Sequence, residues 1–166
     1  MSGLMLRQVK DFVVVPACVY LKLHSLAAEK LLMGTIAHES RGRFLDQVLG
    51  PDDRTLGPAY GLFQIEAATH VDLYENFLEY RRELRIRLRS LQADWPDEDT
   101  QLATNLMYAA AVARLIYYRD AKPLPAPDNI RGLARYWKRV YNTPAGKGEV
   151  EDWLMHWDRD VATLYA

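Results

Sequence analysis

Apolar side chains recur every three or four residues along most of the chain, the spacing that gives a helix one buried face. The pattern predicts helices over residues 4–12, 21–40, 66–91, 97–118 and 129–141, and a last helix from Val150 to Leu164. A break is expected near Val71 and Asp72. The fold is therefore expected to be mainly α.

Glycine, proline and aspartate are concentrated in residues 41–61, between two of the predicted helices. This composition predicts a long irregular loop or a small hairpin. The valines at positions 13–15 are the only other strand candidate. Pro16 is expected to interrupt the first helical stretch, Gly42 to end the second, and Asp128 to cap the helix that follows it.

The length of 166 residues fits one domain, 1–166, with a full hydrophobic core. Twenty-one lysines and arginines against 22 acids give a formal charge of −1, which argues against nucleic acid or an anionic membrane as partner. Cys18 lies in an apolar run and is expected to be a buried thiol. That run is too short to span a bilayer, and no signal peptide is recognisable, so membrane insertion is not expected.

The four histidines, His24, His38, His70 and His156, lack the spacing of metal ligands, and no phosphate-binding loop occurs. No metal and no cofactor are therefore expected. Trp137, like the tryptophans of the last helix, is interpreted as a core residue.

One carboxyl group stands out because of its position. Glu39 lies at the end of an apolar predicted helix, just before the loop rich in glycine and proline. Partial burial and the negative end of the helix dipole both favour the protonated form of a carboxyl group there. A protonated carboxyl group is what general-acid cleavage of a glycosidic bond requires, as in the lysozyme that is a standard example of such tuning.

Four motifs in order accompany Glu39 over residues 30–148: Glu39-Ser40, Gly61-Leu62-Phe63-Gln64-Ile65, Asn105-Leu106 with Ala109, and Tyr141-Asn142. Together they resemble the motifs of the goose-type lysozyme and soluble lytic transglycosylase superfamily. The resemblance implies a lysozyme-like single domain that acts as a peptidoglycan muramidase. Its substrate would be the β-1,4 bond between N-acetylmuramic acid and N-acetylglucosamine in the glycan strands.

The resemblance also implies roles for individual residues. Glu39 would be the general acid and base. The implied substrate-binding set is Ser40, Gly61, Leu62, Phe63, Gln64, Ile65, Asn105 and Tyr141. Ser40 would orient the carboxyl group or a sugar substituent, or bond a backbone carbonyl; Tyr141 would hold the carboxyl group of Glu39 through its hydroxyl.

Two chemistries remain open for such a site. A hydrolytic lysozyme needs a second carboxylate, for which Asp52, Asp53 and Glu66 are the candidates, although turn and helix-start roles explain each of them as well. A lytic transglycosylase needs one carboxyl group only, since the substrate's own N-acetyl and 6-hydroxyl groups complete the reaction. The single-acid interpretation is favoured.

A short catalytic chain without a signal peptide suits a bacteriophage or prophage protein. It would be made in the host cytoplasm and reach the cell wall after release, as an endolysin does, or as part of a virion beside other virion proteins. A different class of function keeps the fold without the chemistry: a catalytically inactive phage structural or glycan-binding protein.

Overall fold

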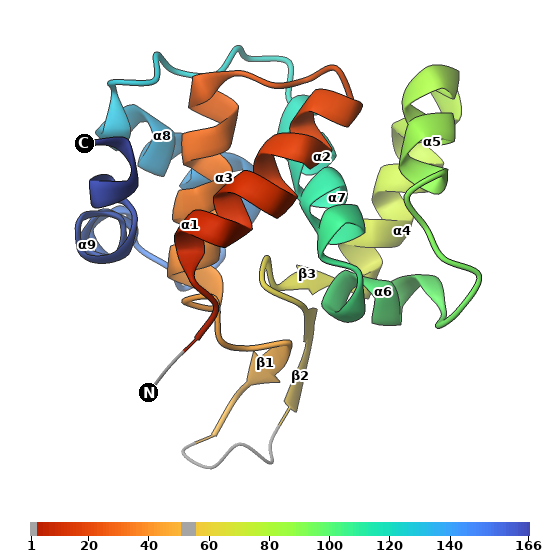
Figure 1. The fold of residues 1–166 in the computed structure, drawn as a ribbon, viewed down its shortest axis with the longest axis horizontal. Coiled ribbons are helices and arrows are strands. Elements are labelled where there is room, and N and C mark those ends of the chain that lie inside the picture. Colours follow the sequence, from red (N-terminus) through yellow and green to blue (C-terminus); the bar gives the residue numbers. More distant parts are fainter. Residues whose placement is uncertain (1–2, 51–55) are drawn as a thin grey trace.

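The computed structural model describes residues 3–50 and 56–166, and it is mainly helical with a small three-stranded sheet (Figure 1). Helix α3 (Leu26–Glu39) lies at the centre and is buried from Ala27 through Ala37, apart from Lys30. Three later helices pack around it, namely α7 (Leu106–Tyr118), α8 (Ile130–Trp137) and α9 (Val150–Asp160). The centre of the fold is thus the helix whose last residue is Glu39.

The first helical stretch is longer than the sequence pattern predicts. It runs from α1 (Leu6–Val9) through a π-helical turn (Lys10–Val14) into α2 (Val15–Tyr20). The predicted interruption at Pro16 and the strand at residues 13–15 were therefore wrong. Proline lacks a backbone N–H and crowds the preceding turn of a helix, and the wider π turn just before Pro16 accommodates it without ending the helix.

The expected hairpin is present and forms part of a larger sheet. Strand β1 (Asp46–Val48) pairs antiparallel with β2 (Leu56–Tyr60), which pairs antiparallel with β3 (Ile65–Glu66). Tyr60 lies opposite Ile65, so the tight turn at residues 61–64 joins β2 to β3. The sheet extends from the lower end of the helical body in Figure 1, close to the end of α3.

Two helices and a short 3-10 turn occupy residues 67–91. The predicted break at Val71 and Asp72 was wrong: α4 (Ala67–Asn76) passes through both, and the chain breaks instead at the 3-10 turn Leu78–Tyr80 before α5 (Arg82–Arg89). Helices α6 (Glu98–Thr104) and α7 (Leu106–Tyr118) replace the single helix predicted over 97–118. Asn105, between them, leaves helical geometry and caps α7.

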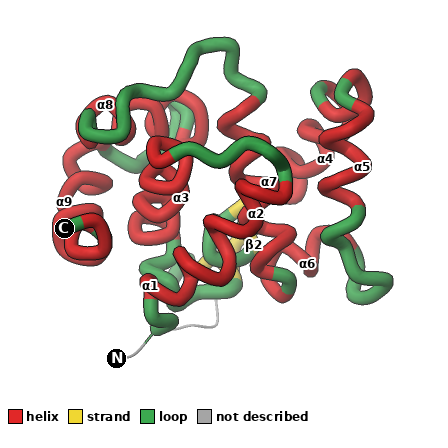
Figure 2. The backbone as a smooth tube through the Cα atoms, turned by 45° about the horizontal axis from the view of Figure 1, so that its top comes forward, coloured by secondary structure: helices red, strands yellow, loops and turns green. Residues whose placement is uncertain are grey.

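A long loop, green at the top of Figure 2, leads from α7 to α8 (Ile130–Trp137). The cap of α8 is Asn129, whose side chain accepts from the Gly132 N–H, and not the predicted Asp128. A π turn (Lys138–Asn142) ends that helical stretch. Helix α9 (Val150–Asp160) and a 3-10 turn (Ala162–Tyr165) complete the chain.

Close packing between α3 and α9 depends on one glycine. A Cβ atom added at Gly34, in the middle of α3, would lie 2.0 Å from the Trp153 ring. Trp153 is fully buried and stacks in parallel on Trp157, with ring centroids 5.7 Å apart. The absence of a side chain at Gly34 therefore lets α9 approach the helix that carries Glu39.

Buried Cys18 agrees with the sequence prediction, and burial raises the pKa of its thiol to about 11. Across residues 3–50 and 56–166, no helix combines the length and apolar character needed to cross a membrane.

Candidate active site

The carboxyl group of Glu39 is the centre of the candidate site. Glu39 is the last residue of α3 and is half-buried. The indole Nε1 of Trp137, on α8, donates a hydrogen bond of 3.0 Å to Glu39 Oε1. Burial raises the pKa of Glu39 from 4.5 to about 7, and the indole hydrogen bond opposes this by favouring the charged form.

Two tyrosines lie close to this carboxyl group. Tyr117 (α7) and Tyr141 (the π turn after α8) stack with ring centroids 5.1 Å apart. Burial raises the pKa of both well above the usual value, and the nearby Glu39 carboxyl group adds to each shift. The two hydroxyls are therefore neutral and add no charge beside Glu39.

Neither tyrosine hydroxyl bonds the carboxyl group. Tyr141 donates to the Phe63 carbonyl at 2.7 Å, so its expected hydrogen bond to Glu39 is not formed. The Tyr117 hydroxyl lies 2.7 Å from Thr35 Oγ1, which itself donates to the Leu31 carbonyl. Because the single Thr35 proton is used in that way, Tyr117 donates to Thr35.

His38, the residue before Glu39, brings no positive charge to the site. Its ring packs edge-on against Trp137 with centroids 4.4 Å apart, and its Nδ1 lies 3.1 Å from Nδ1 of His156 on α9. Burial, followed by the neighbouring His156, lowers the pKa of His38 to about 4. Near neutral pH the environment of Glu39 therefore lacks a His38 cation that would favour the carboxylate.

The 61–65 motif packs directly against the end of α3. Buried Ser40 donates to the Leu62 carbonyl at 2.8 Å and accepts from the Gly42 N–H at 3.1 Å. The Tyr141 hydroxyl reaches the next carbonyl, that of Phe63. Ser40 thus takes the backbone-bonding role of its two expected alternatives, and together with Tyr141 it fixes the turn beside Glu39.

Position 61 requires glycine because the backbone there packs closely against α6, and not because the backbone must come close to a sugar. Its φ is +76°, and an added Cβ would lie 1.9 Å from the Leu102 carbonyl oxygen of α6. Leu62, Phe63 and Ile65 are all buried in the core, so Phe63 presents no face to a ligand. The apolar members of this motif act by holding the turn in place.

Gln64 is the one partly exposed side chain of the motif. Its backbone has a left-handed φ of +49°, and its amide Nε2 donates to the Gly61 carbonyl at 2.8 Å. This bond uses one of the two amide protons. The other proton and the amide oxygen provide the donor and acceptor that an acetamido group would need.

Asn105 lies apart from these contacts. Its Oδ1 accepts from the Tyr108 N–H at 3.1 Å, and its Nδ2 donates to the Leu91 carbonyl at 2.7 Å. Both ends of the amide therefore serve the start of α7. Its hydrogen bonds do not connect it to Glu39.

The candidates for a second carboxylate divide into two groups. Glu66 is exposed and precedes α4 without a side-chain capping bond. Asp52 and Asp53 lie outside the described residues. In the described part of the chain, no second carboxylate contributes to the raised pKa of Glu39. The same part holds no group of three His, Cys, Asp or Glu side chains arranged for a metal ion.

Trp137 is the residue that sequence reasoning missed. It was assigned to the core, and it is fully buried, but it is also the hydrogen-bond partner of Glu39. An indole N–H can only donate, so a buried tryptophan needs an acceptor. That requirement was visible in the sequence, whereas the identity of the acceptor was not.

Comparison with models of protein families, with curated proteins and with solved structures yields no match for this chain.

Proposed function

We propose that this protein is a lysozyme-like peptidoglycan lytic transglycosylase that uses Glu39 as its general acid and base. The observation that carries the proposal is the half-buried position of the Glu39 carboxyl group at the end of α3, beside the Trp137 indole, where burial raises its pKa to about 7. A group with that pKa is protonated in a large fraction of molecules at neutral pH and still yields a usable carboxylate. The ordered motifs around residues 39, 61–65 and 141 supply the substrate class.

In the first step, protonated Glu39 donates to the glycosidic oxygen as the bond from C1 of N-acetylmuramic acid to that oxygen breaks. The acetamido oxygen of the same sugar bonds to C1 and stabilises the positive charge there. Glu39 is left as a carboxylate, and the Trp137 N–H, which already bonds Oε1, stabilises this charged form.

In the second step, the C6 hydroxyl of the same sugar attacks C1 and displaces the acetamido oxygen. The carboxylate of Glu39 accepts the hydroxyl proton and returns to its acid form. The products are a 1,6-anhydro sugar and a free 4-hydroxyl on the leaving N-acetylglucosamine. No water is consumed, and one enzyme carboxyl group accounts for both proton transfers.

The environment of Glu39 favours this single-acid chemistry over hydrolysis. No neighbouring charge within residues 3–50 and 56–166 contributes to its pKa shift, and the adjacent tyrosine hydroxyls bond backbone or Thr35. A hydrolytic lysozyme that uses Asp52, Asp53 or Glu66 is the second candidate. It predicts incorporation of a water oxygen into the product.

The biological setting is part of the same proposal. The protein would be a phage or prophage component that acts on the cell wall after release or from the virion. An inactive glycan-binding component of a virion is the alternative without chemistry. It predicts binding to purified peptidoglycan but no cleavage.

The decisive test is digestion of purified peptidoglycan in ¹⁸O-labelled water, followed by mass spectrometry of the released muropeptides. We expect 1,6-anhydro products without ¹⁸O from the wild-type protein and from Glu75→Gln, a control at an exposed position of α4. We expect none from Glu39→Gln. Reducing ends that carry ¹⁸O would show that the protein is a hydrolase and not a transglycosylase. If the wild-type protein releases no products over a range of pH and salt, the inactive glycan-binding protein is the remaining alternative.

A further inference from the structure

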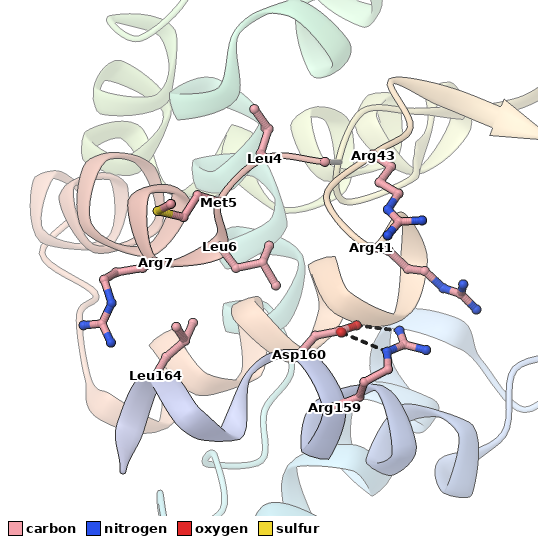
Figure 3. Close-up of a pocket in the computed structure, with 10 residues that line it drawn as sticks. Leu4, Met5, Leu6, Arg7, Arg41, Arg43, Arg159, Asp160 and Leu164 are labelled. Carbon is pink, nitrogen blue, oxygen red and sulfur yellow. Dashed lines mark hydrogen bonds and ion pairs between the residues drawn. The ribbon is translucent and has the colours of Figure 1, made fainter. Parts of the chain in front are cut away.

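A cavity lies beside the turn that follows Glu39. It has a volume of about 660 Å³ and lies between the start of α1, residues 41–43 and the end of α9 (Figure 3). Four arginines line it, namely Arg7, Arg41, Arg43 and Arg159. In Figure 3, Arg7 lies on one side of the cavity, with Arg41 and Arg43 on the other.

The charge of this arginine cavity is strongly positive although the whole chain has a formal charge of −1. Asp160 is the one acidic residue that lines it in the described part of the chain, and it forms an ion pair with Arg159. Among the residues that the structure describes, no carboxylate lies within ion-pair distance of Arg7, Arg41 or Arg43. Four cations and one anion therefore leave three positive charges around the opening.

The backbone holds Arg41 and Arg43 in fixed positions. Arg41 has a left-handed φ of +55° and is followed by Gly42 at +67°. The Arg43 N–H bonds the Ser40 carbonyl at 2.9 Å, and the Leu4 N–H bonds the Gly42 carbonyl at 3.0 Å. The segment before α1 is thereby attached to the turn that carries the arginines. The backbone positions from which both arginine side chains extend toward a ligand are therefore held in place.

The cavity is not purely ionic. The apolar side chains of residues 4–6 and Leu164 also line it. Its ligand should therefore combine anionic groups with small apolar groups. Guanidinium groups bind carboxylates with two parallel hydrogen bonds, and a site of one charge sign concentrates anions near its opening.

We propose that this cavity binds the carboxylate-bearing peptide stem of peptidoglycan. The inference rests on the proposed function, because a stem peptide is attached to every muramic acid residue next to the bond that Glu39 would cleave. Arg41 follows Glu39 by two residues, so their Cα atoms are at most about 7.6 Å apart. A stem supplies both carboxylates and alanine methyl groups, whereas a polyol phosphate chain supplies charge with little for the apolar lining to contact.

The test measures binding without cleavage. The probe is the synthetic pentapeptide L-Ala-γ-D-Glu-L-Lys-D-Ala-D-Ala, titrated into the full chain by calorimetry at low salt, beside the same peptide with its carboxylates amidated. We expect the acid form to bind at least about tenfold more tightly than the amide form. We expect at least a tenfold loss in Arg41→Gln/Arg43→Gln and no comparable loss in Arg82→Gln/Arg85→Gln, which removes the same charge from α5.

Several outcomes overturn the proposal. Equal binding of acid and amide peptides, equal losses in both double variants, or no binding to the wild type would each do so. Tighter binding of a glycerol phosphate oligomer than of the peptide would assign the cavity to a phosphate polymer instead. Thermal melts of both double variants exclude unfolding as the cause of a loss. Because Glu39→Gln should still bind the peptide, a failure of cleavage and a failure of stem binding can be distinguished.

Discussion

The two ends of α3 hold a buried and a half-buried carboxyl group in contrasting environments. Glu29, in the first turn, is 6% exposed; its Oε2 lies 3.0 Å from His24 Nε2 and its Oε1 lies 3.9 Å from Lys10 Nζ. Glu39, at the last residue, has a neutral indole as its hydrogen-bond donor. The helix dipole favours negative charge at the first end and disfavours it at the second.

This contrast separates a structural carboxyl group from a chemically active one. The Lys10 ammonium group, the hydrogen bond with His24 and the helix N-terminus compensate the desolvation of Glu29, so its burial supports the packing of α3 against the N-terminal helices. Glu39 has no such compensation, and its pKa rises to about 7. The carboxyl group at the start of α3 thus stabilises the packing of the helix, whereas the one at its end is the proposed proton donor.

The largest expected effect comes from removing the acid at the catalytic end. Glu39→Gln should lower the turnover of peptidoglycan by about 10²- to 10⁴-fold, the range typical of a general acid. Release of soluble muropeptides over time measures it. The exposed Glu75→Gln should keep wild-type turnover, and residual activity of Glu39→Gln near the wild-type rate would remove Glu39 from the mechanism.

The next effect is on the pH dependence of stability. Because folding raises the pKa of Glu39 above 4.5, its contribution is fully present below pH 4.5 and is lost as pH rises through about 7. The free energy of unfolding of the wild type, relative to Glu39→Gln, should therefore fall by roughly 3 kcal/mol between pH 4 and pH 8. Urea unfolding at both pH values measures it, and a constant difference would contradict the raised pKa.

A substitution at the start of α3 should lower the stability of the protein and leave its turnover of peptidoglycan unchanged. Glu29→Gln removes the negative charge that faces Lys10 and His24, and we expect a loss of about 2 kcal/mol in the free energy of unfolding. Turnover measured well below the melting temperature should be unchanged. A loss of turnover in the folded variant would mean that the two ends of α3 are not independent.

The smallest effect concerns the donor to Glu39. Trp137→Phe removes the hydrogen bond that favours the charged carboxyl group, so the pKa of Glu39 should rise further and the alkaline limb of the activity profile should move to higher pH. A stability loss of about 1 kcal/mol should accompany it. A pH–rate profile beside that of Trp153→Phe, a buried tryptophan without a bond to Glu39, separates the specific effect from general loosening. A shift to lower pH would contradict the assignment.

Local sequence patterns predicted the helical character, the end of α3 and the hairpin region well. Periodic apolar positions and the Ser40–Gly42 ending are local signals, and they place the end of α3 to within one residue. The predicted start at residue 21 was wrong, because the helix begins only at Leu26, after the Ser25 cap. The errors at Pro16 and at Val71–Asp72 arose where packing overrides a local preference. A π turn accommodates the proline, and α4 continues because one face of it stays buried at Leu73 and at His70, which is hydrogen-bonded to Tyr108.

The sequence by itself determined that a glutamate ends a buried helix, with a glycine-rich segment and an aromatic C-terminal region to follow. Only the tertiary structure decided which groups meet there: Trp137 bonds the carboxyl group across 98 positions of sequence, Tyr141 bonds Phe63, and Asn105 caps a helix elsewhere. The reason is physical. Helix formation depends on neighbours three or four residues apart, whereas desolvation and hydrogen bonding at Glu39 depend on helices brought together by packing.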